Sequence, residues 1–249
     1  MPNLFVVMPV FNEPSTLAPS LARVRAATVS GVALRVILVD DGSDAETRAQ
    51  AESLRDHSAA DGGVPVELIR HPANRGKGAA IRTGFARALE IAVEGDLVLV
   101  QDADLEYDPA DFAALARPAL EGSADLVLGN RWATAPKGMK RAAHRMLNGF
   151  LTLASNVMTG LRVADMECCL KLFTVPALRR VLPELDEERF GIEPQIVASA
   201  ARNSLRVREV PVRYEPRGFD EGKKIRMKDG LRVFVVLWRE RRRRPRPDR

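Results

Sequence analysis

The chain has 249 residues, of which 46% are hydrophobic and 29% charged, so it can bury a packed core and lacks the composition of a disordered protein. Its two cysteines are adjacent, at Cys168 and Cys169, which excludes a disulfide framework and a CxxC zinc site, and three scattered histidines argue against a histidine metal site. The net charge of +5 is uneven, because residues 223–249 carry 12 Lys and Arg against 3 Asp and Glu. The remaining residues carry 26 against 30, so the charge alone does not indicate nucleic acid.

The apolar stretches of the chain are too short to span a membrane, which takes about 20 mainly apolar residues. The longest uncharged run, 146–161, also contains Asn, Ser and Thr. The N-terminal MPNLFVVMPVF lacks the basic region of a signal peptide and predicts a buried first strand. We therefore expect a cytoplasmic protein, either in solution or lying on a membrane surface.

The first half of the chain alternates apolar runs with helical patterns. Strands are predicted at 4–10, 34–39, 64–70, 97–100 and 125–129. Helices are predicted from a Ser15 cap to about residue 28, at 45–57, at 78–93 and from Pro109 onward. Continuously apolar strands that alternate with helices are typical of a parallel sheet covered on both faces.

The second half is less regular. Helices are predicted at 141–161, 193–203 and 229–244, and strands at 168–175 and 205–214. No internal repeat or long linker divides the chain. We expect one domain over 1–235, followed by a basic tail over 236–249.

Acidic residues follow several of the predicted strands. Glu13 comes after the first strand, Asp40 after the second, and Asp102 and Asp104 after the fourth. Parallel sheets bind ligands at the carboxyl ends of their strands. Carboxylate oxygens suit Mg²⁺ or Mn²⁺, so Asp102 and Asp104 are candidate metal ligands, with Glu106 as a further one. The alternative is an ordinary acidic turn, in which Asp108 caps the helix that follows.

Several motifs resemble inverting family 2 glycosyltransferases. They are Pro-Val-Phe-Asn-Glu at 9–13, Asp-Asp-Gly-Ser at 40–43, Asn-Arg-Gly-Lys-Gly-Ala-Ala at 74–80 and Asp-Ala-Asp-Leu-Glu at 102–106. Later segments are similar to the dolichyl- and polyprenyl-phosphate hexosyltransferase branch. These are 129–131, 165–168, 189–194 and 209–211 with 221–224. The motifs occur in order over residues 4 to about 235, which makes the set more specific than any single motif.

The resemblance implies a GT-A fold, a Rossmann-like α/β architecture with a mixed, mainly parallel sheet and helices on both faces. It also implies a nucleotide-sugar donor, a bound Mg²⁺ or Mn²⁺ and an inverting transfer. The residues it assigns to the donor are Pro9, Phe11, Glu13, Val39, Asp40, Lys77, Asp102, Ala103, Asp104, Arg217 and Lys223. Lys224 belongs to the same late loop, which in the resembling enzymes closes over the diphosphate.

The acceptor implied by the resemblance is a polyprenyl phosphate. Arg131 and Arg145 are the candidates for binding its phosphate, because arginine suits phosphate through paired N–H groups. A lipid phosphate is already anionic and needs no strong base, whereas a hydroxyl acceptor requires one. Asp165 is then the first candidate for the base and Glu167 the second. Asp104, Arg131 and Asp165 are the expected catalytic residues.

Three alternatives remain open at this point. The acceptor can be a sugar hydroxyl of a polysaccharide or glycolipid. The arginine tail can mark a nucleic-acid-binding protein, although 5% aromatic residues and an acidic remainder argue against that. The third alternative is a Rossmann oxidoreductase, but this chain has no GxGxxG motif after its first strand. UDP-glucose and GDP-mannose are the leading donors.

The C-terminal segment predicts contact with a membrane surface or with a membrane-protein partner. It combines the apolar run 234–238 with arginines from Arg239 onward, the pattern of a basic interfacial helix. The helix predicted at 141–161 also has a broad apolar face, which serves either a membrane contact or core packing.

Overall fold

The computed structural model describes residues 1–60, 63–133, 139–216 and 227–243, apart from the side chains of 56–60, 139–144 and 227–231. A seven-stranded mixed sheet forms its centre, in the order β3-β2-β1-β4-β6-β5-β7. The strands are β1 (Asn3–Val10), β2 (Ala33–Asp40), β3 (Val66–Arg70), β4 (Leu97–Val100), β5 (Leu126–Asn130), β6 (Lys171–Thr174) and β7 (Val207–Pro211). The pairs β1–β2, β1–β4, β2–β3 and β5–β7 are parallel, whereas β6 runs antiparallel to β4 and β5.

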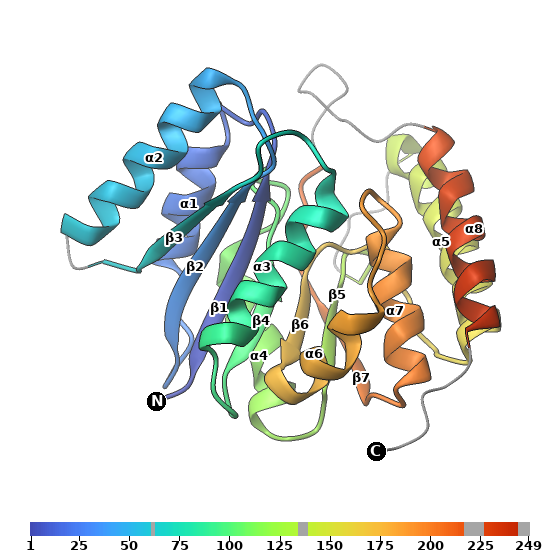
Figure 1. The fold of residues 1–249 in the computed structure, drawn as a ribbon. Coiled ribbons are helices and arrows are strands. Elements are labelled where there is room, and N and C mark those ends of the chain that lie inside the picture. The colour runs from blue at the N-terminus through green and yellow to red at the C-terminus, as the bar shows by residue number, and fades with distance from the viewer. Residues whose placement is uncertain (61–62, 134–138, 217–226, 244–249) are drawn as a thin grey trace.

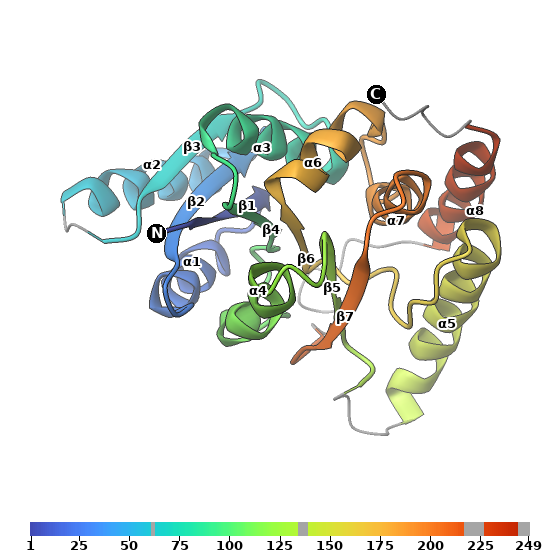
Figure 2. The same ribbon diagram turned by 90° about the horizontal axis from the view of Figure 1, so that it is seen from below.

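The helices occupy the connections between the strands. They are α1 (Leu17–Ala26), α2 (Ala45–Ala60), α3 (Lys77–Ile91), α4 (Phe112–Leu120), α5 (Met139–Thr159), α6 (Val175–Val181), α7 (Ile192–Arg202) and α8 (Met227–Arg242), with short 3-10 turns at Pro109–Asp111 and Leu182–Glu184. In Figure 2, α3 and α6 lie on one face of the sheet and α1 and α4 on the other. The predicted α/β fold, with a mixed, mainly parallel sheet covered on both faces, is confirmed.

Two local predictions need correction. The residue at the N-cap of α1 is Thr16 rather than Ser15, and its hydroxyl donates to Glu13 Oε2 at 2.9 Å instead of capping the helix. The strand predicted at 168–175 is shorter, and its end becomes α6. The Thr174 hydroxyl accepts from Ala177 N at this point, and proline in the first turn favours the helix.

The core forms where the apolar strands meet the helices that cover them. Phe85 of α3 and Phe173 of β6 stack edge to face, with ring centroids 5.7 Å apart. The backbone of α3 approaches the sheet closely at Gly84, where an added Cβ would lie 2.3 Å from a Val7 methyl group. A larger residue at this position would push α3 away from β1.

Helices α5 and α8 lie side by side, separated from the central strands by α7 (Figures 1 and 2). Leu151, Ala154 and Met158 of α5 pack toward the core. Part of the apolar face of this helix therefore serves core packing, which was one of the two roles predicted for it. Another part faces outward: the exposed side chains are Met146, Leu147, Phe150, Leu153 and Val157.

Helix α8 continues across residue 235, where we expect the domain to end. Beyond that point Glu240 is buried and accepts from Gln195 Nε2 of α7 at 2.9 Å and from Arg202 Nη1 at 2.6 Å. Arg239 and Arg243 form ion pairs with Asp186. These two arginines therefore attach α8 to the fold, which differs from the expectation that all arginines from Arg239 onward face a membrane or partner. The separate tail stays a prediction.

Gly76 offers a test of the packing at the start of α3. Its φ of +104° suits glycine, and an added Cβ would lie 2.3 Å from the Glu188 carbonyl oxygen. We expect Gly76→Ala to lower the free energy of unfolding in urea by about 3 kcal/mol, through backbone strain and the clash together. Gly122→Ala is the control, because Gly122 has a φ of +69° but nothing within 4 Å of its added Cβ. It should cost about 1 kcal/mol, and equal losses in the two variants would contradict the predicted clash.

Candidate active site

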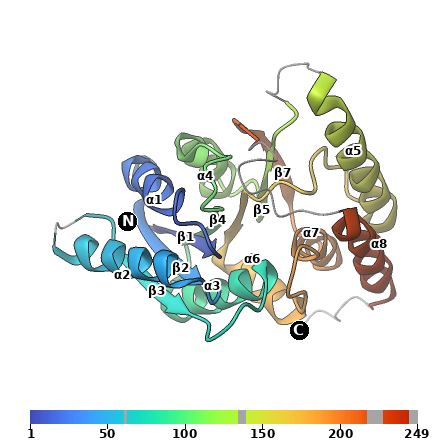
Figure 3. The same ribbon diagram turned by 90° about the horizontal axis from the view of Figure 1, so that it is seen from above.

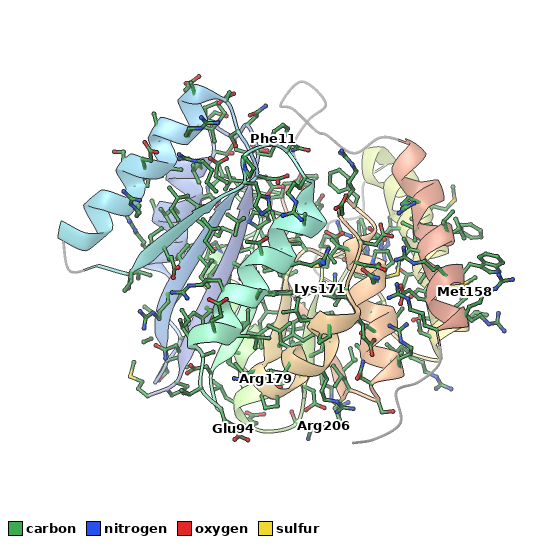
Figure 4. All side chains as sticks on the ribbon, in the orientation of Figure 1. Phe11, Glu94, Met158, Lys171, Arg179 and Arg206 are labelled. Carbon is green, nitrogen blue, oxygen red and sulfur yellow. The ribbon has the colours of Figure 1, made fainter. Side chains whose placement is uncertain are left out.

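The candidate site lies at the carboxyl ends of the parallel strands, where the strand order reverses between β1 and β4. Seen from this end in Figure 3, the loops after β1, β2 and β4 gather over the sheet. Phe11, which directly follows β1 and is partly exposed, marks this edge of the sheet in Figure 4. The loop after β1 is joined to the loop after β2, because Asn12 N donates to Ser43 Oγ at 3.1 Å and Asp44 N to Asn12 Oδ1 at 2.8 Å.

The two aspartates of the Asp-Asp-Gly-Ser turn have different partners. Asp40 is fully buried and accepts from Ser43 N and from Arg70 Nε, both at 2.9 Å. Asp41 accepts from Gly76 N at 2.7 Å and from Arg75 N at 3.0 Å, and contacts His71 Nδ1 at 2.6 Å. Asp41 therefore holds the loop that leads into α3, a role the sequence did not reveal. Contact of Asp40 with a nucleotide stays a prediction.

Lys77 connects three segments of the site. Its Nζ lies 2.8 Å from Asp102 Oδ2, after β4, and 2.8 Å from Glu193 Oε1, in the first turn of α7. Burial alone would lower the pKa of the Lys77 ammonium, but the carboxylates of Asp102 and Glu193 outweigh it and raise that pKa well above its usual value. Lys77 therefore carries a fixed positive charge beside the predicted metal motif.

The turn after β4 carries the predicted metal ligands. Leu105 adopts a left-handed conformation with a φ of +64°, which is uncommon for a bulky residue and is found at functional turns. Asp104 Oδ1 accepts from Glu106 N at 3.1 Å, and Glu106 Oε2 accepts from the Tyr214 hydroxyl at 3.0 Å. Among the residues that the structure describes, no group of three His, Cys, Asp or Glu is arranged to hold a metal ion.

The donor set of this turn nevertheless fits a hard divalent cation. Mg²⁺ is usually held by one or two carboxylates together with substrate phosphates and water, so three protein ligands are not required. Asp102 and Asp104 supply two partly exposed carboxylates in one turn. The metal roles of Asp102, Asp104 and Glu106 remain predictions.

Arg131, just after β5, is fixed in a buried ion pair. Its Nε and Nη2 donate to the two oxygens of Asp165, each at 2.7 Å, and its backbone N donates to Asp165 Oδ2 at 3.0 Å. Asn148 of α5 bonds to both partners at 3.2 Å. The guanidinium carbon also lies over the rings of Trp132 and Tyr214, at 5.2 and 5.1 Å from their centroids. The plane of this cation is therefore set before any ligand binds.

Asp165 is a poor proton acceptor in this arrangement. Burial alone would raise the pKa of its carboxyl group, but the hydrogen bonds and charge of Arg131 outweigh it and lower that pKa. Both carboxylate oxygens are engaged. The geometry thus favours a role in holding Arg131 over the predicted role of a base.

Glu167, the second predicted base, has a different environment. Burial, together with the nearby charge of Glu193, raises the pKa of its carboxyl group to about 7, against the opposing effects of Lys171 and Arg131. A carboxyl group with this pKa can hold or release a proton near neutral pH.

The other predicted residues are distributed around this site. Val39 and Ala103 are buried, so neither presents its side chain at the surface of the site. Pro9 and Glu13 are partly exposed, and Arg145 is exposed on α5. Arg217, Lys223 and Lys224 lie outside the described residues.

Tyr214, Asn148 and Glu193 are site residues that the sequence analysis did not assign. Glu193 had a signal, because it is a lone acidic residue at the start of the apolar helix α7. Tyr214 and Asn148 had none, because their contacts with Arg131 join positions 83 and 17 residues away along the chain.

Comparison with known proteins identifies relatives over most of the chain. A family model described as "Glycosyl transferase family 2" matches residues 5–182. An uncharacterized protein of Methanocaldococcus jannaschii is 26% identical over 212 residues, which are 85% of this chain and 81% of the relative. An undecaprenyl-phosphate 4-deoxy-4-formamido-L-arabinose transferase of Edwardsiella ictaluri is 32% identical over 219 residues, or 88% of this chain. The match spans only 62% of that transferase.

The fold is also similar to that of solved structures. Glucosyl-3-phosphoglycerate synthase from Mycobacterium tuberculosis, in complex with Mg²⁺ and UDP, superposes with a TM-score of 0.65 at 19% identity. The match covers 96% of this chain and 79% of that one. At this identity the likeness concerns the fold alone, and it agrees with the expected GT-A architecture.

The buried pair Arg131–Asp165 predicts a large effect of one substitution. Asp165→Asn would leave the Arg131 guanidinium buried without a counter-charge, so we expect the free energy of unfolding in urea at pH 7 to fall by about 3–5 kcal/mol. Because the pKa of Asp165 is lowered, this contribution exists at neutral pH and disappears as the pH falls through that pKa, below the usual value of 3.8. Asp125→Asn is the control, since Asp125 pairs with the exposed Arg206 at 2.7 Å. This variant should lose at most about 1 kcal/mol of unfolding free energy. An equally small loss in Asp165→Asn would show that the buried Arg131 charge does not need the Asp165 carboxylate.

Proposed function

The chain belongs to glycosyl transferase family 2, and on this premise we propose that it transfers a hexose from a nucleotide sugar to the phosphate of a polyprenyl lipid, with inversion and with a divalent cation. The curated relatives named as undecaprenyl-phosphate transferases support the acceptor class, and the UDP complex of the structural neighbour supports the donor class. UDP-glucose and GDP-mannose remain the leading donors.

The observation that carries this proposal is the contact of Tyr214 with two groups at once. Its hydroxyl donates to Glu106, in the turn of Asp102 and Asp104, and its ring lies beneath the Arg131 guanidinium. The single side chain of Tyr214 therefore separates the turn proposed to bind the diphosphate from the arginine proposed to bind the acceptor phosphate. Transfer between two phosphate-bearing substrates needs this proximity, because the acceptor oxygen attacks in line with the departing diphosphate.

On the donor side, Asp102 and Asp104 would hold Mg²⁺ or Mn²⁺, which stabilises the leaving diphosphate as a Lewis acid when bound. Lys77 presents its fixed positive charge next to Asp102 and attracts the same leaving group. Because Asp41 holds the backbone of Arg75 and Gly76, the ammonium of Lys77 is positioned before the substrate arrives.

On the acceptor side, Arg131 orients the lipid phosphate. Asp165, Asn148 and the two aromatic rings hold the guanidinium, so little side-chain freedom remains to be lost on binding. The phosphate oxygen is already anionic and attacks the anomeric carbon without transferring a proton. Because this reaction needs no base, it is compatible with an Asp165 whose two carboxylate oxygens both bind Arg131.

A sugar hydroxyl is the second candidate acceptor, and Glu167 favours it. A hydroxyl must lose its proton during attack, and the Glu167 carboxyl group, with a pKa of about 7, can accept one at neutral pH. The nature of the product separates the candidates, since a sugar attached to a lipid phosphate is released by mild acid.

The outer face of α5 and α8 supports a lipid surface as the place of reaction. No helix among the described residues is long and apolar enough to cross a membrane. This face carries seven of the ten large hydrophobic side chains that are exposed in the described part of the chain: Met146, Leu147, Phe150, Leu153 and Val157 on α5, and Val235 and Trp238 on α8. Arg241 and Arg242 are exposed on the same helix as Trp238. Apolar side chains beside exposed arginines suit an anionic leaflet.

Asp104→Ala tests the proposed metal site. We expect Mn²⁺-dependent transfer from UDP-glucose or GDP-mannose to undecaprenyl phosphate to fall at least about a hundredfold, because the leaving diphosphate loses its counter-charge. Product formation is measured with radiolabelled donor, with and without EDTA. Asp108→Ala is the control: Asp108 caps the next turn, accepting from Ala110 N at 2.9 Å, and its loss should affect stability but not transfer. Full activity of Asp104→Ala would contradict the proposal.

Phe150→Ser with Trp238→Ser tests the lipid surface. We expect the double variant to bind vesicles rich in phosphatidylglycerol about tenfold more weakly or worse, since two large apolar side chains are lost from the contact, while binding of the nucleotide sugar persists. Sedimentation with vesicles measures the binding. Val93→Ser, at an exposed apolar position outside these helices, should have no effect. Unchanged sedimentation of the double variant would rule out this face as the contact.

A further inference from the structure

Two carboxyl groups of the site each have a buried oxygen atom that lacks a partner among the residues that the structure describes. Glu167 Oε1 and Glu193 Oε2 are buried, and neither accepts a hydrogen bond from any residue that the structure describes. Glu193 is 5% exposed and uses its other oxygen for Lys77. A buried polar atom without a partner costs about 1–3 kcal/mol, so two such oxygens in one site indicate that something else supplies the bonds.

The turn that carries Glu167 is fixed on both sides. Lys171, which is buried near the middle of the molecule in Figure 4, donates from Nζ to the carbonyl oxygens of Met166, at 3.0 Å, and of Cys168. Glu209 of β7 accepts from the backbone N of Ala164 and of Asp165, at 2.8 and 2.9 Å. The backbone next to Glu167 is therefore held by its neighbours, while the carboxyl group itself retains an unused oxygen.

These carboxyl groups are linked to both charged parts of the site. Glu193 contacts Lys77, which contacts Asp102 of the metal turn. Glu167 is close enough to Glu193, Lys171, Arg131 and Asp165 to respond to the charge of each. In the proposed reaction the transferred sugar occupies the space between the leaving diphosphate and the acceptor phosphate.

We propose that Glu167 and Glu193 form the hydroxyl-binding subsite for the transferred sugar, an inference that rests on the proposed function. A sugar hydroxyl both donates and accepts, so it satisfies a carboxylate oxygen and a protonated carboxyl group equally well. A carboxyl group near another carboxylate retains its proton more readily. The pair can thus present carboxylate oxygens as acceptors together with one O–H group as a donor.

Other ligands fit the pair less well. A phosphate would meet two carboxyl groups and be repelled. A second metal ion would meet two ammonium groups, that of Lys77, which already occupies one oxygen of Glu193, and that of Lys171, whose charge acts on Glu167. A neutral, hydroxyl-rich ligand meets neither obstacle. The subsite would favour sugars that retain their hydroxyl groups, because a deoxy analogue leaves the carboxyl oxygens unsatisfied.

Binding measurements with and without the sugar test this assignment. Calorimetry in Mn²⁺ compares UDP-glucose with UDP and GDP-mannose with GDP, for the full chain and for Glu167→Ala. We expect Glu167→Ala to weaken binding of the sugar nucleotide about tenfold, the equivalent of one lost hydrogen-bonding group, with binding of the matching nucleoside diphosphate within about twofold of wild type. Glu167→Gln retains a hydrogen-bonding group and should recover most of the loss.

Glu94→Ala is the matched control, since Glu94 is exposed at the opposite end of the sheet from Phe11 (Figure 4) and should alter neither measurement. Equal weakening of both ligands by Glu167→Ala, or no weakening of either, would overturn the subsite. Unchanged sugar-nucleotide binding with transfer lost in both Glu167 variants would overturn it as well, in favour of a base. A wild-type chain that binds none of the four nucleotides would overturn the proposed function itself.

Discussion

The ammonium group of Lys77 joins the parts of the molecule on which the site depends. It lies 2.8 Å from Asp102 and from Glu193, so the start of α3, the end of β4 and the first turn of α7 meet at one cation. A buried charge needs such partners, because transfer of an isolated ion out of water is costly. The loop that carries Lys77 is fixed in turn by Asp41 and by the close approach of Gly76 to residue 188.

A second buried cation, Arg131, organises the other half of the site in a similar manner. Asp165 neutralises it, Asn148 bonds to both groups, and Glu209 holds the backbone of Asp165. Tyr214 connects this cluster with the turn of Asp102 and Asp104. In the proposed function these two cations serve the two anionic substrates, while Glu167 and Glu193 each keep a buried oxygen atom without a partner among the described residues. This arrangement separates groups that are fixed by the fold from groups that are left for a ligand.

Helix α8 relates the site to the surface of the protein. Arg232 donates to Glu187 at 3.0 Å, and the Glu187 carbonyl oxygen lies 2.4 Å from the position of an added Cβ at Gly78, the residue after Lys77. Buried Glu240 attaches the far end of α8 to α7. The helix therefore presents Trp238 outward while its other side contacts the segment that packs on the start of α3. The exposed apolar face proposed for lipid and an inner contact with the site come from the same sixteen-residue helix.

The sequence by itself determined the α/β class, the strands of the first half and the ordered motifs, because apolar periodicity and turn residues act over a few neighbouring positions. It placed Asp102 and Arg131 after the fourth and fifth strands, and the fold agrees, whereas Lys77, expected in a loop, is the first residue of α3. Only the tertiary structure decided how these side chains are paired: that Asp40 meets Arg70, that Asp165 is engaged by Arg131, and that Arg239 and Arg243 attach α8. The partners are distant along the chain, and both burial and pKa depend on the whole surroundings of a group rather than on its neighbours in sequence.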